Sequence, residues 1–168
     1  MRSVSLAQTF DHAEALLRGA SPAAAYVHVP FCQHKCHYCD FYSIVDGRNR
    51  ETRYVERLHD ELIATAAIAD LSNLTTIFIG GGTPTLLEAA TLARMLDDIK
   101  SILVEPAGGI KEWTIEVNPE TLDAEKAEIL VECGVTRVSI GCQSFTPRSL
   151  KTLERLHDPR TVPRAVGY

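Results

Sequence analysis

The sequence predicts an α/β protein whose strands form a parallel sheet. Short runs rich in β-branched and aromatic residues alternate with longer stretches of helical periodicity, and the residues of unusual chemistry follow the ends of the short runs. Strands that alternate with helices of this length are joined by right-handed crossovers, so they lie parallel while the helices cover an outer face. A doubly wound sheet and a closed barrel both satisfy this pattern.

Hydrophobic spacing and end signals place the individual elements. We expect strands at 26–29, 75–79, 112–117 and 136–140, and helices at 52–69, 86–103 and 122–133. Val55 and Leu62 fall on one face of the first helix. Thr85 and Glu88 have capping-box spacing at the start of the second helix, and Gly134 ends the third.

Length and composition place the chain among soluble globular proteins. It has 168 residues, of which 45% are hydrophobic, so it can bury a core without covalent staples. The odd number of cysteines and the charges near the start, where a signal peptide would be apolar, favour a reducing cytoplasmic location. A net charge of -5 without a basic cluster argues against nucleic acid, and no apolar run is long enough to span a bilayer.

The unusual residues converge if the strands are parallel. The cysteine-rich stretch 32–39 follows the first strand, the run GGGTPT at 80–85 follows the second, Glu116 closes the third, and GCQSF at 141–145 closes the fourth. Binding sites of parallel α/β folds gather at the carboxyl ends of the strands. The sequence therefore predicts one shared site.

Three cysteines in the spacing C-x3-C-x2-C form the strongest signal in the chain. Cys32, Cys36 and Cys39 can converge on one metal centre, whereas three thiols cannot pair evenly as disulfides. Zinc is one alternative, with His34 or His37 completing a tetrahedron. A 4Fe-4S cluster is the other: it normally takes four cysteines, so three leave one iron open for a small chelating ligand.

The remaining candidates are polar or small residues near the strand ends. The run IGGGTPT lacks the lysine of a phosphate loop, so its glycines predict either close backbone approach to an amino-acid ligand or a tight turn. Glu116 and Gln143 are candidate ligand contacts or solvated strand ends, and Arg155 could pair with a carboxylate. Cys133 and Cys142 are expected to be small buried hydrophobic residues.

Four segments taken together resemble a known family. They are YVHVPFCQHKCHYCDF, IFIGGGTPTLL, TIEVNPETL and RVSIGCQSFTPRSLKTLERLHD, and they are similar to the coproporphyrinogen dehydrogenase (HemN-like) family of radical S-adenosylmethionine proteins. The resemblance implies a 4Fe-4S cluster on the three cysteines, with S-adenosylmethionine on the open iron and cleaved to a radical by the reduced cluster. It also implies contacts with that molecule from Tyr26, Tyr38 and Glu116, and with a second one from Gly81, Gly82, Thr83, Gln143 and Arg155.

One position separates two branches of that family. The decarboxylating dehydrogenases carry a fourth cysteine two residues after the third, whereas this chain reads Cys39, Asp40, Phe41. This resembles the haem-chaperone branch, HemW, and implies binding of haem, its delivery to a haemoprotein acceptor, and a reductant such as flavodoxin. Oxidative decarboxylation of coproporphyrinogen III is the enzymatic alternative, and a zinc-stabilised interaction module is the alternative of another class.

The resemblance also bears on domain organisation. Residues 1–24 are expected to form a lead segment and residues 25–168 an incomplete radical S-adenosylmethionine core. Members of the family have a barrel of about six βα units, of which about four are expected here. A barrel interrupted in this way leaves an edge strand unpaired.

Overall fold

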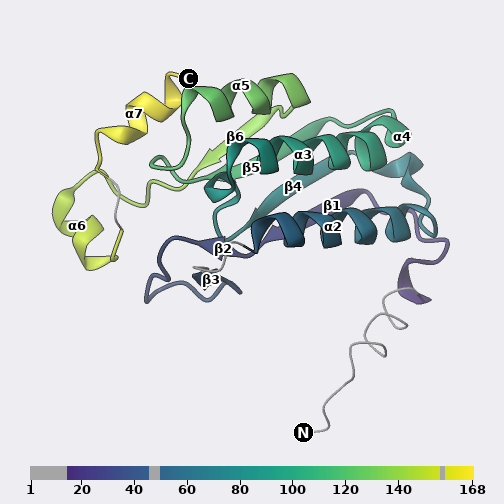
Figure 1. Ribbon diagram of the computed structural model, residues 1–168, viewed down its shortest axis with the longest axis horizontal. Helices are drawn as coiled ribbons and strands as arrows, with labels where there is room; N and C mark the ends of the chain where they lie inside the picture. Colours follow the sequence, from purple (N-terminus) through teal and green to yellow (C-terminus); the bar gives the residue numbers. More distant parts are fainter. Residues whose placement is uncertain (1–14, 46–49, 156–157) are drawn as a thin grey trace, which may run out of the picture.

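A computed structural model of the chain describes residues 15–45, 50–155 and 158–168, and shows a sheet with helices stacked along it (Figure 1). The sheet is parallel throughout and has the spatial order β1 (Ala24–Val29), β4 (Thr76–Gly81), β5 (Glu112–Val117) and β6 (Arg137–Ile140). The strands follow one another in chain order without the reversal of a doubly wound sheet. The predicted α/β class and parallel sheet are confirmed, in the arrangement of a partial (β/α) barrel.

Three helices run alongside the sheet: α2 (Glu51–Ala66), α3 (Ala89–Ile99) and α5 (Ala124–Cys133). In each case the helix connects one strand to the next, as a parallel crossover requires. Two shorter helices follow β6, namely α6 (Pro147–Thr152) and α7 (Thr161–Val166). None of the helices in the described ranges is long and apolar enough to cross a membrane.

The short elements shape the connections. β2 (Phe31–Cys32) and β3 (Ile44–Val45) form a separate two-stranded pair beyond the end of β1. The other short elements are η1 (Leu71–Asn73), η2 (Pro84–Leu86), the π-helical turn η3 (Lys100–Val104) and α4 (Glu105–Ala107). The predicted lead segment 1–24 lies partly outside the described residues, and its end leads into β1.

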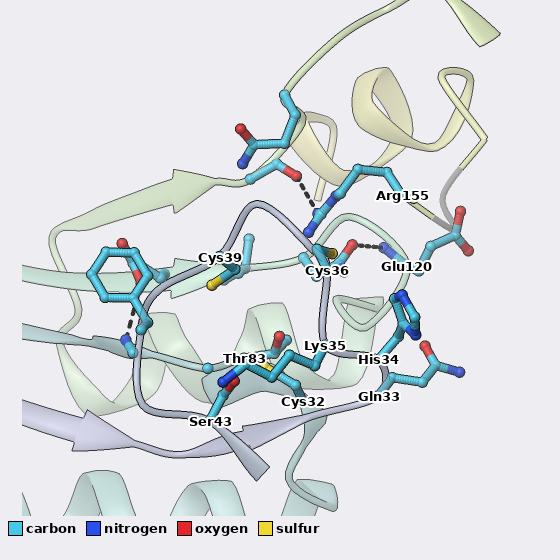
Figure 2. A pocket seen from close by; sticks show the side chains of 18 of the residues that line it. Cys32, Gln33, His34, Lys35, Cys36, Cys39, Ser43, Thr83, Glu120 and Arg155 are labelled. Carbon is cyan, nitrogen blue, oxygen red and sulfur yellow. Dashed lines mark hydrogen bonds between the residues drawn. The ribbon is translucent and has the colours of Figure 1, made fainter. Parts of the chain in front are cut away.

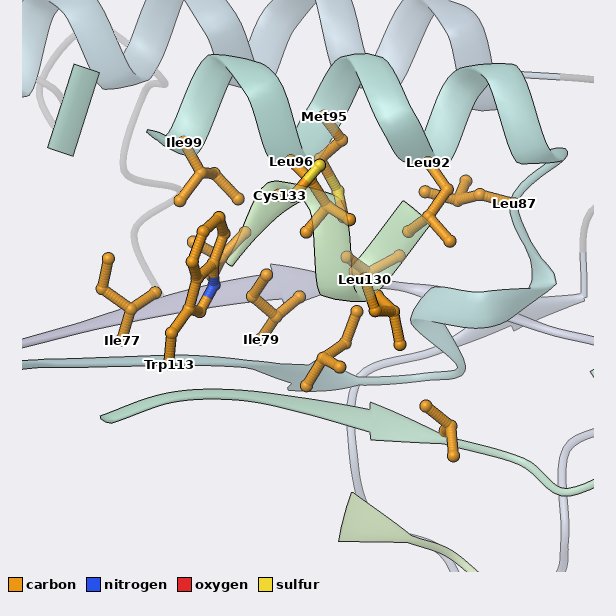
Figure 3. Close-up of a cluster of buried hydrophobic side chains, with 14 of the residues drawn as sticks. Ile77, Ile79, Leu87, Leu92, Met95, Leu96, Ile99, Trp113, Leu130 and Cys133 are labelled. Carbon is orange, nitrogen blue, oxygen red and sulfur yellow. The ribbon is translucent and has the colours of Figure 1, made fainter. Parts of the chain in front are cut away.

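The hydrophobic core lies between the sheet and the helices (Figure 3). Trp113 and Ile115 on β5, together with Ile79 on β4, are almost completely buried. They meet Leu96 of α3 and Leu130 of α5, which are also buried. Alternation along each strand sends these side chains to the helix-covered face and their neighbours to the opposite face, where Glu116 lies.

The observed boundaries correct two predictions. The helix expected at 86–103 is α-helical only from Ala89 to Ile99 and then widens into the π-helical turn η3. Its N-cap is Glu88, without a side-chain cap, so the capping box is wrong. Thr85 is instead fully buried, and its hydroxyl lies 2.6 Å from the hydroxyl of Thr121. The side chain of Thr85 thus bonds to a residue distant in sequence rather than to a backbone amide at the start of α3. Gly134 does end α5, with a φ of 94°.

Two neighbouring residues of α5 test the core. Leu130→Ala is expected to lower the free energy of unfolding by about 2–5 kcal/mol. The substitution removes buried methyl groups and leaves a cavity that the surrounding core fills only in part. Val131 is 74% exposed, so Val131→Ala should change the free energy by less than about 0.5 kcal/mol. Urea denaturation of both variants measures the difference, and equal losses would contradict this placement of the core.

Candidate functional site

The carboxyl ends of β4, β5 and β6, together with the loop that begins at the end of β2, border one cavity of about 310 Å³. Its wall includes every predicted site residue except Tyr26: Cys32, Cys36, Tyr38, Cys39, Gly81, Gly82, Thr83, Glu116, Gln143 and Arg155. Residues from five separate stretches of the chain therefore meet at one edge of the sheet. Figure 2 shows the cysteine loop on one side of this cavity and Arg155 above it.

The three cysteines lie along the connection between β2 and β3. Cys32 ends β2, and the amide of Ile44 donates a hydrogen bond of 2.8 Å to the carbonyl of Pro30, which closes the loop. A turn inside the loop brings the amide of Cys39 within 3.0 Å of the carbonyl of Cys36. All three thiols are free, and all three border the cavity (Figure 2).

The chemistry of these thiols fits a cationic iron–sulfur cluster. Burial raises the pKa of Cys32, the hydroxyls of Ser43 and Thr83 lower it, and the neighbouring thiols of Cys39 and Cys36 raise it again. A metal centre between the sulfurs would reverse this repulsion and favour the thiolates. Within the described residues, no three His, Cys, Asp or Glu side chains gather closely enough for a single metal ion.

The glycine run packs against the strand that leads into the cysteine loop. The amides of Gly82 and Thr83 donate hydrogen bonds of 2.7 Å to the carbonyls of Val29 and Phe31. A Cβ atom on Gly82 would lie 2.4 Å from the oxygen of Phe31, and one on Gly81 would lie 2.6 Å from the ring of His28. At Gly81 and Gly82 the close backbone approach is made toward the protein itself, and both glycines also border the cavity.

Glu116 projects from β5 into the cavity wall. Its Oε2 atom accepts a hydrogen bond of 3.2 Å from the amide of Gly81, which partly compensates the burial of the carboxylate. Tyr26 lies on the same open face of the sheet, outside the cavity wall, and its hydroxyl is 3.1 Å from Nδ1 of His28. Burial and the nearby Glu116 carboxylate raise the pKa of Tyr26.

Arg155 supplies a half-buried cationic group with a free donor. Its Nη2 atom donates a 2.7 Å hydrogen bond to the carbonyl of Gly141, while its buried Nε has no hydrogen-bond partner among the described residues. The guanidinium also opposes the rise in pKa that burial causes at Tyr38. Gln143 stands beside it with a φ of 55°, a strained conformation of the kind that clusters at functional sites. The free N–H suits an anionic ligand group such as a carboxylate.

Several residues of the wall were not predicted. Asn118 and Ser139 lie at or just after the ends of β5 and β6, so the rule that led to Glu116 could also have identified them. Ser43 and Glu154 gave no sequence signal, because the positions of both depend on how loops fold back toward the cavity.

The two remaining cysteines differ from each other. Cys133 is buried between α5 and α3, and burial together with the Asp97 carboxylate raises its pKa to about 11. It is an inert apolar residue, as predicted. Cys142 is only partly buried and lies outside the cavity wall, because it follows β6 at the edge of the sheet.

Comparison with known proteins assigns the fold and the cysteine loop to a family. The model of the radical SAM superfamily matches residues 26–167, which is most of the chain. The chain belongs to the radical SAM superfamily. Membership implies a 4Fe-4S cluster and S-adenosylmethionine.

Curated relatives cover this radical SAM region at substantial identity. The chain is 42% identical over 139 residues to the heme chaperone HemW of Bacillus subtilis, and 40% identical over 145 residues to that of Escherichia coli. These matches cover 83% and 86% of this chain but only 36% and 38% of the relatives. The chain therefore spans little more than a third of their length.

A solved structure shares the fold of this radical SAM chain. The coproporphyrinogen III oxidase HemN of Escherichia coli superimposes with a TM-score of 0.75 over 98% of this chain and 37% of the other. Sequence identity is 22%, so the likeness concerns the fold.

A substitution in the glycine run tests the packing that positions the loop. Gly82→Ala is expected to lower the free energy of unfolding by about 1–3 kcal/mol, because the new methyl group would overlap the backbone carbonyl of Phe31, which cannot rotate away. Gly109→Ala is the control, since the nearest atom to its Cβ is 3.9 Å away. Thermal unfolding of the two variants measures the effect, and similar melting temperatures would show that the glycine run does not contact the strand.

Proposed function

We propose that this chain is the cofactor-binding core of a haem chaperone of the HemW type. In this proposal residues 25–168 form the core, with the cluster bound by Cys32, Cys36 and Cys39. The observation that supports it most directly is the placement of three free thiols at the wall of one cavity, in a chain of the radical SAM superfamily. The protein is proposed to act in the cytoplasm, where thiols stay reduced.

The other residues of the wall suit S-adenosylmethionine. When bound, the cluster would supply the electron that cleaves this molecule. Glu116 offers a carboxylate to an ammonium or to ribose hydroxyls, and the free Nε of Arg155 offers a donor to a carboxylate. Tyr38 and Gln143 border the same space, whereas Tyr26 would need the ligand to extend along the open face of the sheet. Gly81, Gly82 and Thr83 contribute backbone to the wall.

The haem-chaperone assignment has separate support. Relatives with 40% identity or more carry the name heme chaperone HemW. The residue two positions after Cys39 is Phe41, where the dehydrogenase branch would have a fourth cysteine. Haem would be the cargo and an apo-haemoprotein the acceptor, and a reductant such as flavodoxin would supply electrons to the cluster.

Cysteine substitution tests the cluster assignment. Protein reconstituted without oxygen is expected to bind about four iron atoms per chain, and Cys36→Ala should lose most of that iron because one ligand is missing. Cys142→Ala is the matched control, since this thiol lies outside the cavity wall and its loss should leave the iron content unchanged. Iron and sulfide analysis with visible spectra gives the answer. A colourless protein that retains zinc would contradict the proposal.

A transfer assay separates the chaperone from the dehydrogenase. The protein that carries this chain, purified with its cluster, is expected to bind haem, pass it to an apo-haemoprotein and leave coproporphyrinogen III unchanged. Movement of the Soret absorbance to the acceptor reports delivery. Formation of protoporphyrinogen IX together with methionine and 5′-deoxyadenosine would instead establish the decarboxylating activity.

A further inference from the structure

The turn that follows α6 reaches back to the cysteine loop. Oε2 of Glu154 lies 3.4 Å from Nε2 of His34 and 3.3 Å from Nδ1 of His37, and it also accepts a hydrogen bond of 3.3 Å from the backbone amide of His37. The backbone carbonyl of Glu154 lies 3.8 Å from Sγ of Cys36. One residue, 118 positions farther along the chain, therefore contacts both sides of the central cysteine.

The geometry of these contacts is specific. A carboxylate only accepts hydrogen bonds, so a neutral His34 must carry its proton on Nε2 to donate to Glu154, whereas His37 donates through its backbone amide. The carboxylate thereby favours one tautomer of His34 and contacts the loop on both sides of Cys36. The side chain of Glu154 is 49% exposed, so each contact alone is weak, and the effect depends on the three acting together.

The backbone of Glu154 is strained in a way that glycine would relieve. Its φ is 52°, in the left-handed region that residues with a Cβ rarely adopt. It follows Leu153, the C-cap of α6, and the next amide, that of Arg155, bonds 2.9 Å back to the carbonyl of Leu150. This is the position after a helix where glycine is most favourable. A glutamate here is unfavourable for the turn itself, which points to a role for its side chain.

We propose that Glu154 is a positioning residue that holds the cysteine loop in its cluster-binding conformation. It acts through His34 and His37 and does not itself bind the metal. This inference rests on the proposed function, because it assumes that the loop binds a cluster. Without the carboxylate, the loop should open more often and the cluster should be released faster.

The sharpest test is Glu154→Gly, which removes the carboxylate and the backbone strain together. If Glu154 merely supported the fold, its loss would lower the melting temperature. Glu154→Gly should instead melt at the wild-type temperature or higher. At the same time it should release iron to a chelator about threefold faster or more. Glu154→Gln keeps one acceptor oxygen and the strained backbone, so its rate of iron release should lie between those of the wild-type protein and Glu154→Gly. Lys151→Ala, on the exposed side of α6, is the control and should release iron at the wild-type rate.

A double-mutant cycle identifies the path of the effect. His37→Ala should speed iron release in the wild-type background and add little in the Glu154→Gly background, because the contact is already absent. Additive effects would show that Glu154 does not act through His37. Unchanged iron release in Glu154→Gly, or a release that only follows a lower melting temperature, would overturn the proposal.

Hydrogen exchange of the metal-free protein keeps this inference distinct from the proposed function. The amide of His37 donates to Glu154, so it should exchange about threefold faster or more in Glu154→Gly while amides of the sheet are unaffected. If the wild-type protein takes up no cluster, the proposed function fails, and the exchange rate still reports on the contact. If the wild-type protein binds a cluster and the His37 amide exchanges equally in both proteins, only the role of Glu154 fails.

Discussion

The structure of the site depends on two backbone hydrogen bonds that join the glycine run to the end of β1 and to β2. The amides of Gly82 and Thr83 donate to the carbonyls of Val29 and Phe31, and the approach is so close that no side chain fits at Gly82. These bonds place the end of β4 against the residues that lead directly into Cys32. The cysteine loop is thereby attached to the sheet at its base, and the cavity wall has a defined shape on that side.

The two faces of the sheet have different roles. One face carries Trp113, Ile115 and their neighbours, which pack against three helices and account for the core. The other face carries Tyr26 and Glu116, and it is open at Tyr26, whose side chain is largely exposed. Side chains on this face can serve a ligand because the stability of the domain comes from the opposite face. The candidate site lies where the open face meets the ends of the strands.

The features of the site that depend on local sequence pattern could be predicted from the sequence. The cysteine spacing indicated that the three thiols could converge, and all three border one cavity, while alternation along β5 placed Glu116 on the face opposite Ile115. Prediction failed where a tertiary partner decides the outcome. Thr85 looked like a helix cap, but its hydroxyl is paired with Thr121, which is remote in sequence. Glu154 was not singled out from the sequence, because its partners lie on a loop more than a hundred residues earlier.

The residues alone determined the alternation of strands and helices, the parallel sheet and the group of cysteines, because these follow from periodicity and from spacing within a short stretch of chain. Only the tertiary structure decided which polar groups meet: the free Nε of Arg155 at the cavity, the glycine run against Phe31, and the carboxylate of Glu154 between two histidines. Such contacts join segments whose separation in sequence carries no information about their distance. They arise from the way loops pack once the core has set the positions of the strand ends.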